Sequence, residues 1–230
     1  MDKRFFSNNV NLIVIDYNDF WETKYMEPKW LEWAKQPQSI AQAGLTYRRI
    51  FMTWKGFESL REISVDIIAH HTEIDKTIIR DLFANKTGYA TPKIDIRAVV
   101  FRDNKILMVK EKMDGDWSLP GGWGDIGFTS SEVAIKETKE ESGFDVKAIK
   151  LISVFDKKCH PQPPSLYHVY KMFIQCEIIG GRAEEGMETN AVAFFAENEL
   201  PSLSMARNTE SQVKLAFGHL NNLHLPTYFD

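Results

Sequence analysis

Three glutamates near the middle of the chain have the type and spacing of metal ligands. At about 100° per residue along a helix, Glu137, Glu140 and Glu141 fall within roughly a third of its circumference. Like charges at this spacing repel each other, so a helix gains no stability by gathering them. A bound divalent cation would compensate the repulsion, and hard carboxylate oxygens are the ligands that Mg2+ prefers.

The segment that carries these glutamates has the start and stop signals of a helix. Thr129 and Glu132 form a T-x-x-E capping box, and Gly143 suits the left-handed position that closes a helix. Upstream, residues 119–122 read LPGG, which indicates a strand end followed by a turn where the backbone can approach a ligand closely. Taken alone, the charges also fit a solvated acidic helix, but their fixed spacing from the glycines disfavours that interpretation.

Composition restricts the classes of protein that fit. The chain has 230 residues, of which 43% are hydrophobic and 26% charged, enough for one large or two small domains. The net charge of −4 gives no general attraction to nucleic acid or anionic membranes, and the helical residues 29–84 lack a basic stripe, so DNA is not expected as a partner. With only Cys159 and Cys176 and no apolar run of about 20 residues, we expect a reduced, cytoplasmic protein without a membrane span.

The chain divides into three parts by the texture of its sequence. Residues 1–27 form an extension of unknown role, with a possible strand at residues 10–15. Helical spacing then predicts helices at residues 29–43, 57–70 and 75–84. After Pro92 the pattern becomes β-rich, at residues 94–100, 106–109, 149–155, 169–178 and 191–195. Long helical segments interrupt it at the acidic helix and near residues 208–217, which fits an α+β layer arrangement.

The glycines and the acidic helix together resemble the Nudix box, G-x5-E-x7-R-E-U-x-E-E-x-G-U, where U is aliphatic. The matching positions are Gly122, Lys136 in place of arginine, Glu137, Glu140, Glu141, Gly143 and Phe144. Phe128 stands where the upstream glutamate belongs, and Thr138 replaces an aliphatic residue. The resemblance implies a Nudix fold and a Mg2+ site, with Mn2+ as a possible substitute, formed at Gly122 and the three glutamates.

The wider sequence is similar to a bacterial Nudix subfamily with an N-terminal helical domain, whose members are described as ADP-ribose or CDP-choline pyrophosphatases. The similarity extends over residues 30–34, 82–85, 88–93, 168–171 and 225–227. It implies a helical domain at residues 28–90, a Nudix hydrolase domain at residues 91–230 and a homodimer formed through the helical domain. The expected reaction cleaves a nucleoside diphosphate derivative to a nucleoside monophosphate and a phosphorylated product.

The residues around the box suggest further roles in catalysis. By the resemblance, Glu137 is both a metal ligand and a catalytic residue. Glu188 lies in a late acidic loop, at a place where many Nudix enzymes supply a general base. Glu141 is the alternative base. For the phosphates we expect Arg97, whose planar fork suits two oxygens, with Lys110 and Lys112 as alternatives.

Candidate contacts for the nucleobase are aromatic. Trp123 follows the glycines, and His160 and Tyr170 lie in or beside the Pro-rich loop 161–164, which is equally compatible with a rigid connector. Phe128, which departs from the box, favours a second hypothesis: a catalytically weak or inactive Nudix domain that binds a nucleotide ligand as a sensor.

Overall fold

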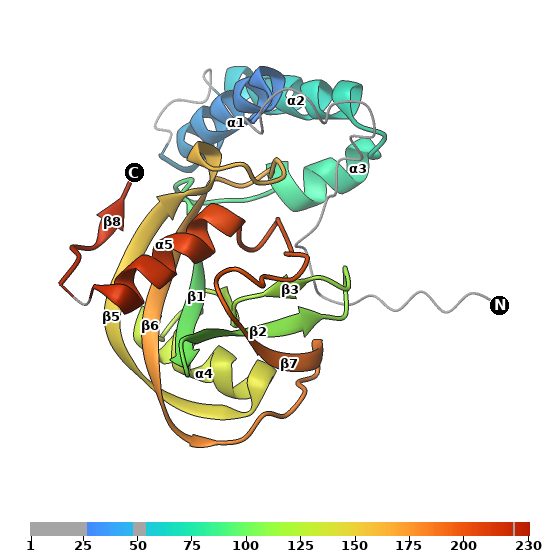
Figure 1. Ribbon diagram of the computed structural model, residues 1–230. Coiled ribbons are helices and arrows are strands. Elements are labelled where there is room, and N and C mark those ends of the chain that lie inside the picture. The colour runs from blue at the N-terminus through green and yellow to red at the C-terminus, as the bar shows by residue number, and fades with distance from the viewer. Residues whose placement is uncertain (1–26, 48–53, 223) are drawn as a thin grey trace. The chain divides into compact units, whose positions relative to one another are not determined.

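The computed structural model describes residues 27–47, 54–222 and 224–230, so the strand expected at residues 10–15 lies outside them (Figure 1). The chain separates into two compact units. The helical unit comprises the described residues up to Thr91 together with Pro163–Tyr167, and the sheet unit comprises those of Pro92–Gln162 and His168–Asp230. Within the described ranges, every helix is too short or too polar to span a bilayer.

The helical unit has α1 (Lys29–Tyr47), α2 (Trp54–His71) and α3 (Lys76–Ile79), which continues as a π-helical turn at Arg80–Ala84. These bounds confirm the expected helices and extend the first two. The core of the unit consists of Leu31, Ala34, Val65, Ile68, Ile79, Phe83, Ala84 and Leu166. Each helix buries one apolar face against the others, which explains the helical spacing in the sequence.

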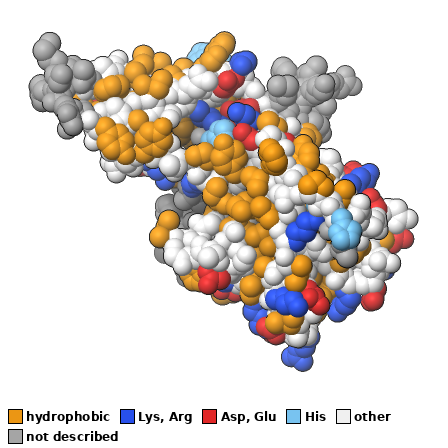
Figure 2. All heavy atoms as spheres, turned by 90° about the vertical axis from the view of Figure 1, so that its left-hand side faces the viewer, with side chains coloured by type: hydrophobic (Ala, Val, Ile, Leu, Met, Phe, Trp, Pro, Cys, Tyr) orange, Lys and Arg blue, Asp and Glu red, His pale blue; other side chains and the backbone are white. Residues whose placement is uncertain are grey.

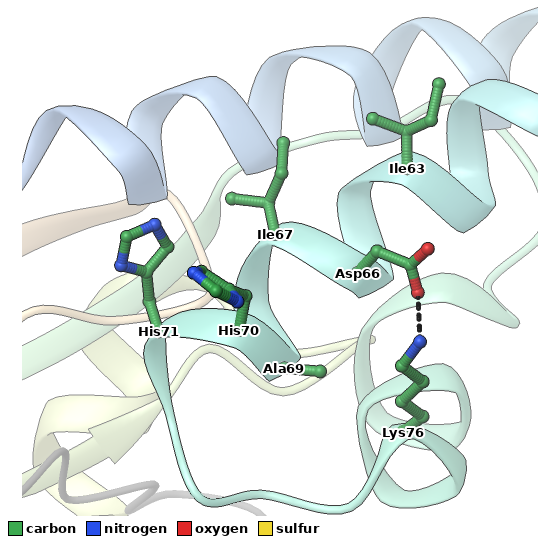
Figure 3. A pocket seen from close by; sticks show the side chains of 7 residues that line it. All are labelled: Ile63, Asp66, Ile67, Ala69, His70, His71 and Lys76. Carbon is green, nitrogen blue, oxygen red and sulfur yellow. Dashed lines mark hydrogen bonds and ion pairs between the residues drawn. The ribbon is translucent and has the colours of Figure 1, made fainter.

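A shallow hollow of about 610 Å³ lies on the helical unit between α2 and α3 (Figure 3). Apolar side chains of α2, Ile63 and Ile67 among them, line one part of it. The ammonium of Lys76 lies 2.6 Å from the carboxylate of Asp66, so an exposed ion pair joins the two helices across the hollow. The charged groups in this hollow are therefore already paired with each other.

The sheet unit is built on a mixed sheet with the order β3-β2-β1-β6-β5-β8. Its strands are β1 (Lys93–Arg102), β2 (Lys105–Glu111), β3 (Trp117–Ser118), β4 (Gly121–Trp123), β5 (Phe144–Asp156), β6 (Val169–Gly181), β7 (Thr189–Phe195) and β8 (Tyr228–Phe229). The central strand β1 runs parallel to β6 and antiparallel to β2 and β4, and β7 pairs with β2. The expected α+β class is confirmed.

Two helices cover opposite faces of this sheet, α4 (Ser130–Ser142) and α5 (Glu210–Asn221) (Figure 1). Alternate residues of a strand point to opposite faces. Ile96 and Ala98 of β1 accordingly pack in one core with α4, whereas Val99 packs in the other core with α5. The acidic helix α4 is thus anchored on the sheet through Val133 and Ala134.

The ends of α4 match the expected signals, but the preceding glycines do not form the expected turn. Thr129 and Glu132 make both hydrogen bonds of a capping box, and Gly143 is left-handed with φ of 78°. Gly121, in contrast, begins the short strand β4. Its φ is 150°, and a Cβ there would lie 2.0 Å from the carbonyl oxygen of Ile96. Glycine at this position therefore allows β4 to approach β1 closely. From the sequence alone, a glycine that marks a turn cannot be distinguished from one that permits such a close approach.

Candidate active site

Glu141 is the buried member of the acidic group on α4. Only 7% of the residue is exposed, and its carboxylate accepts a hydrogen bond of 2.9 Å from the backbone N–H of Gly121 on β4. Burial raises the pKa of this carboxyl to about 8, and the nearby carboxylates of Glu111 and Glu137 add to the rise, although the charge of Arg97 opposes it. The sheet therefore fixes the orientation of Glu141 while leaving its charge poorly compensated.

Glu137 lies against the same strand. A Cβ on Gly122 would lie 3.1 Å from the carboxylate carbon of Glu137, closer than side chains ordinarily pack. Glycine at this position lets the carboxylate lie beside the backbone of β4. The structure thus brings Glu137 and Glu141 together at the glycine strand, as the sequence predicts.

Glu140 occupies a different position from the other two acids. Its side chain is 58% exposed, and its nearest charged partner is the ammonium of Lys136 at 3.6 Å. The same ammonium lies 3.0 Å from Glu137 and 3.3 Å from Asp125. Among the described residues, no three His, Cys, Asp or Glu side chains converge in a geometry that would hold a metal ion. The expected convergence of all three glutamates is therefore not seen in the described residues; instead, the ammonium of Lys136 pairs with both Glu137 and Glu140.

The loop that carries Glu188 is attached to the C-terminal end of α4. The hydroxyl of Thr189 donates a hydrogen bond of 2.8 Å to the carbonyl oxygen of Glu141 and accepts one of 2.8 Å from the N–H of Gly186. Thr189 is fully buried, whereas Glu188 beside it is exposed. One hydroxyl therefore links the loop of the expected base to the backbone of the buried glutamate.

Lys112 also holds this loop. Its ammonium donates hydrogen bonds to the carbonyl oxygens of Gly186 at 3.1 Å and Met187 at 2.9 Å, and its backbone N–H donates to that of Glu188 at 2.9 Å. These contacts give Lys112 a structural role that the sequence did not indicate. Its contact with a phosphate stays a prediction, as does that of Lys110, which lies half-buried on β2.

Arg97 belongs to a buried ionic network behind the glycine strand. Its guanidinium donates to the carboxylate of Asp95 at 2.9 Å and to the carbonyl oxygen of Leu119 at 3.2 Å. Asp95 also pairs with the buried ammonium of Lys171 at 2.5 Å. Burial opposes the ionisation of Asp95, but the charges of Arg97 and Lys171 outweigh it and lower the pKa of that carboxyl. The expected contact of Arg97 with a phosphate stays a prediction. The guanidinium of Arg97 already has hydrogen-bond partners within the protein.

The expected nucleobase contacts lie at separate places on the sheet unit. Trp123 is half-buried on β4 directly beside the glycines, with the ammonium of Lys93 5.2 Å from its ring centre. His160 pairs with Asp230 at 2.9 Å, and Tyr170 lies on β6, partly exposed. Trp123 therefore directly follows the two glycines that lie against the acidic residues, whereas His160 contacts Asp230.

Three residues of this region were missed by the sequence reasoning. Asp125 lies 3.3 Å from the ammonium of Lys136. Its place in the sequence, directly after the glycines, was a signal that could have identified it. Thr189 gave no signal, because nothing in the sequence places its hydroxyl at a helix end. Glu111 is buried on β2, where Arg207 lies 2.9 Å from its carboxylate, although a glutamate in a strand ordinarily indicates an exposed position.

Comparison with known proteins agrees with this architecture. Residues 28–83 match the family described as a UDP-X-like N-terminal oligomerisation domain, and residues 91–216 match the NUDIX domain. A putative ADP-ribose pyrophosphatase of Bacillus subtilis is 44% identical over 205 residues, which span 89% of this chain and 99% of that protein. An ADP-ribose pyrophosphatase of Methanocaldococcus jannaschii is 32% identical over 119 residues, 50% of this chain and 69% of that protein.

Two solved structures are also similar. That of an ADP-ribose pyrophosphatase from Streptococcus suis has a TM-score of 0.56 and 41% identity, covering 61% of this chain and all of that one. That of a UDP-X diphosphatase has a TM-score of 0.57 and 28% identity, covering 88% of this chain and 98% of that one. The NUDIX match alone covers more than half of the chain, and the chain belongs to the Nudix family of enzymes.

Proposed function

We propose that this chain is a divalent-metal-dependent pyrophosphohydrolase that cleaves the diphosphate of a nucleoside diphosphate derivative. The proposal is carried by one observation, the pair of carboxylates of Glu137 and Glu141 set against the backbone of β4. Relatives named for ADP-ribose favour that substrate, and the similarity to a UDP-X diphosphatase makes UDP-linked compounds the next candidates. CDP-choline remains a candidate from the resemblance of the sequence.

The two carboxylates of Glu137 and Glu141 fit a divalent cation such as Mg2+, which proteins usually hold through one or two carboxylates together with substrate phosphates. Glu141 is buried, and the charges of Glu111 and Glu137 help burial to raise the pKa of its carboxyl to about 8, so a neighbouring cation would favour its ionised form. Glu137 and Glu141 offer the hard oxygens that Mg2+ prefers, and Glu140 is one turn from Glu137 on the exposed side. When bound, the cation neutralises charge on the diphosphate and lowers the pKa of the attacking water.

The chain itself would then orient the reactants and move the proton. Glu188 is our candidate base, because its carboxylate is exposed on a loop that is fixed to the end of α4 through Thr189. Trp123, next to the glycines, is the candidate platform for the nucleobase. The products would be a nucleoside monophosphate and the phosphorylated remainder of the substrate.

The decisive experiment measures release of nucleoside monophosphate from ADP-ribose, a UDP-sugar and CDP-choline, with and without Mg2+ or Mn2+. We expect metal-dependent turnover of at least one compound and its loss in Glu141→Gln. Glu177→Gln is the matched control, since Glu177 is an exposed acid of β6 that pairs with Lys147. Absence of turnover across the panel with either metal would refute the proposal.

A second candidate function rests on Phe128, which is 52% exposed where the box usually has a glutamate. A domain with this change could bind a nucleotide ligand without hydrolysing it. Thermal-shift measurements with the same compounds distinguish the two functions, because a ligand that binds only the native state raises the unfolding temperature. A shift without turnover would favour a sensor.

We also propose that two copies of the chain pair through the helical unit. The match of residues 28–83 to a domain described as an oligomerisation domain supports this proposal. From the cysteine content, we still expect a cytoplasmic protein whose cysteines are reduced.

A further inference from the structure

The outer face of α1 exposes large apolar residues at regular spacing. Trp33 is 60% exposed, Ile40 57% and Tyr47 66%. Residues seven apart on a helix drift by only about 20° per repeat, so these three lie in one line. At a rise of about 1.5 Å per residue the line is about 21 Å long. We call these three residues the α1 stripe.

The other face of the same helix is already used. Leu31, Ala34 and Ala41 are fully buried in the helical unit, and the amide of Gln38 donates to the carbonyl oxygens of Phe83 and Ala84. The packing of the described residues of the unit therefore does not account for the α1 stripe. Exposed hydrophobic side chains are visible on the helical unit, in the upper part of Figure 2.

The α1 stripe has the pattern of a helix-pairing surface. Between its members, the three-four spacing continues with Gln36 and Ala43, and charged residues are absent from Gln36 to the end of the helix at Tyr47. Regular apolar positions at this spacing are typical of helices that pack lengthwise on a partner helix. Tyr89, also exposed, lies with its ring centre 6.4 Å from that of Tyr47 and extends the apolar surface.

We infer that the α1 stripe is the surface through which a second copy of this chain binds, with the two α1 helices antiparallel about a two-fold axis near Ile40. The stripe suits this symmetry, because Ile40 is equidistant along the helix from Trp33 and Tyr47. Each tryptophan would then contact the tyrosine of the other copy. Antiparallel helices also place opposite dipole ends together, which favours this orientation over the parallel one. The inference deepens the proposed pairing of two chains by naming its surface.

The first test measures oligomeric state by light scattering on a size-exclusion column. We expect a dimer for the wild type at micromolar concentration and at least a tenfold weaker dimer for Ile40→Glu, since two carboxylates would meet at the axis. Ile149→Glu is the matched control, because Ile149 is 52% exposed on β5 of the sheet unit. A monomeric wild type would refute the pairing itself, whereas an undisturbed Ile40→Glu dimer would refute only the surface.

A mixing experiment excludes misfolding as the cause. Ile40→Lys alone should also be monomeric, and an equimolar mixture of the Glu and Lys variants should recover the dimer through complementary charge. Failure of the mixture to associate would contradict a contact at the two-fold axis.

Cross-linking tests the orientation, in a Cys159→Ser background because Cys159 is exposed. Ile40→Cys should link to itself upon oxidation. With a short bismaleimide, Trp33→Cys should link to Tyr47→Cys in a mixture but not to itself. Self-linking of Trp33→Cys would overturn the antiparallel arrangement.

Discussion

Replacement of Thr189 by valine tests how much the hydroxyl of Thr189 contributes to holding the loop of Glu188 against α4. Valine has nearly the shape of threonine but lacks the hydroxyl, so the change removes two hydrogen bonds with little change in volume. The lost partners are the carbonyl oxygen of Glu141 and the N–H of Gly186. Both would be left without their present partner at the contact between loop and helix.

The expected cost follows from these two groups. Leaving a buried polar group unsatisfied costs about 1–3 kcal/mol, and Gly186 is only half-buried, so we expect a loss of about 2–4 kcal/mol in the free energy of unfolding. This is less than the usual stability of a domain, about 5–15 kcal/mol, so the variant should still fold. If Glu188 is the base, its displacement by about 1 Å would lower kcat by roughly tenfold to a hundredfold.

Two measurements check the Thr189→Val prediction. Urea unfolding gives the free energy of unfolding, and turnover of the best substrate gives kcat for the folded variant. Thr189→Ser is the control, since it keeps the hydroxyl and loses one methyl group, worth about 0.8 kcal/mol. Glu188→Gln supplies the second arm of a double-mutant cycle, in which Thr189→Val should add little to the loss of kcat already caused by Glu188→Gln. A stability within about 0.5 kcal/mol of the wild type would refute the reasoning, because surface substitutions commonly have effects of that size.

Three further predictions concern other parts of the sheet unit. Glu188→Gln should lower kcat about a hundredfold or more if Glu188 is the base, and a change below about threefold would exclude that role. Gly121→Ala should destabilise the unit by more than about 2 kcal/mol in urea unfolding, because its Cβ would lie 2.0 Å from the carbonyl oxygen of Ile96. Gly124→Ala, whose Cβ would have ordinary contacts with Ile94, should be tolerated as the control. Burial and the ammonium of Lys150 lower the pKa of His219. Below a pH of about 6.5 the imidazole of the unfolded chain therefore binds a proton more readily than that of the native state, and the free energy of unfolding should fall as the pH drops. His219→Gln should remove this slope of up to about 1.4 kcal/mol per pH unit, and an unchanged pH profile of unfolding would contradict the assignment.

The helix of the active site was predictable because its signals are local. A capping box and a left-handed glycine act within one or two turns, and the structure shows both of them at α4. The same holds for the alternating strands and for the helices of the first unit. Local periodicity records which face of an element is buried, so it is readable from one sequence.

The environment of the glutamates was less predictable because it depends on contacts between distant segments. Arg97 suggested a phosphate contact by its chemistry, but its orientation follows from the ladder that pairs it with Gly121 and from the carboxylate of Asp95. Glu141 and Glu140 are adjacent in the chain, yet one is buried and the other exposed. Spacing on a helix fixes the direction of a side chain, whereas its burial depends on what the rest of the fold places opposite it.

Glu141 shows how these long-range contacts prepare a site. Its carboxylate accepts a hydrogen bond from β4, and its backbone carbonyl accepts one from Thr189 at the start of β7. Two strands therefore hold the same residue from its two ends, which restricts both the side chain and the last turn of α4. A carboxylate held in this way loses little conformational entropy when it binds a cation. The energy needed to keep a buried, poorly compensated acid in place is thus supplied by the fold, through residues that need not touch the substrate.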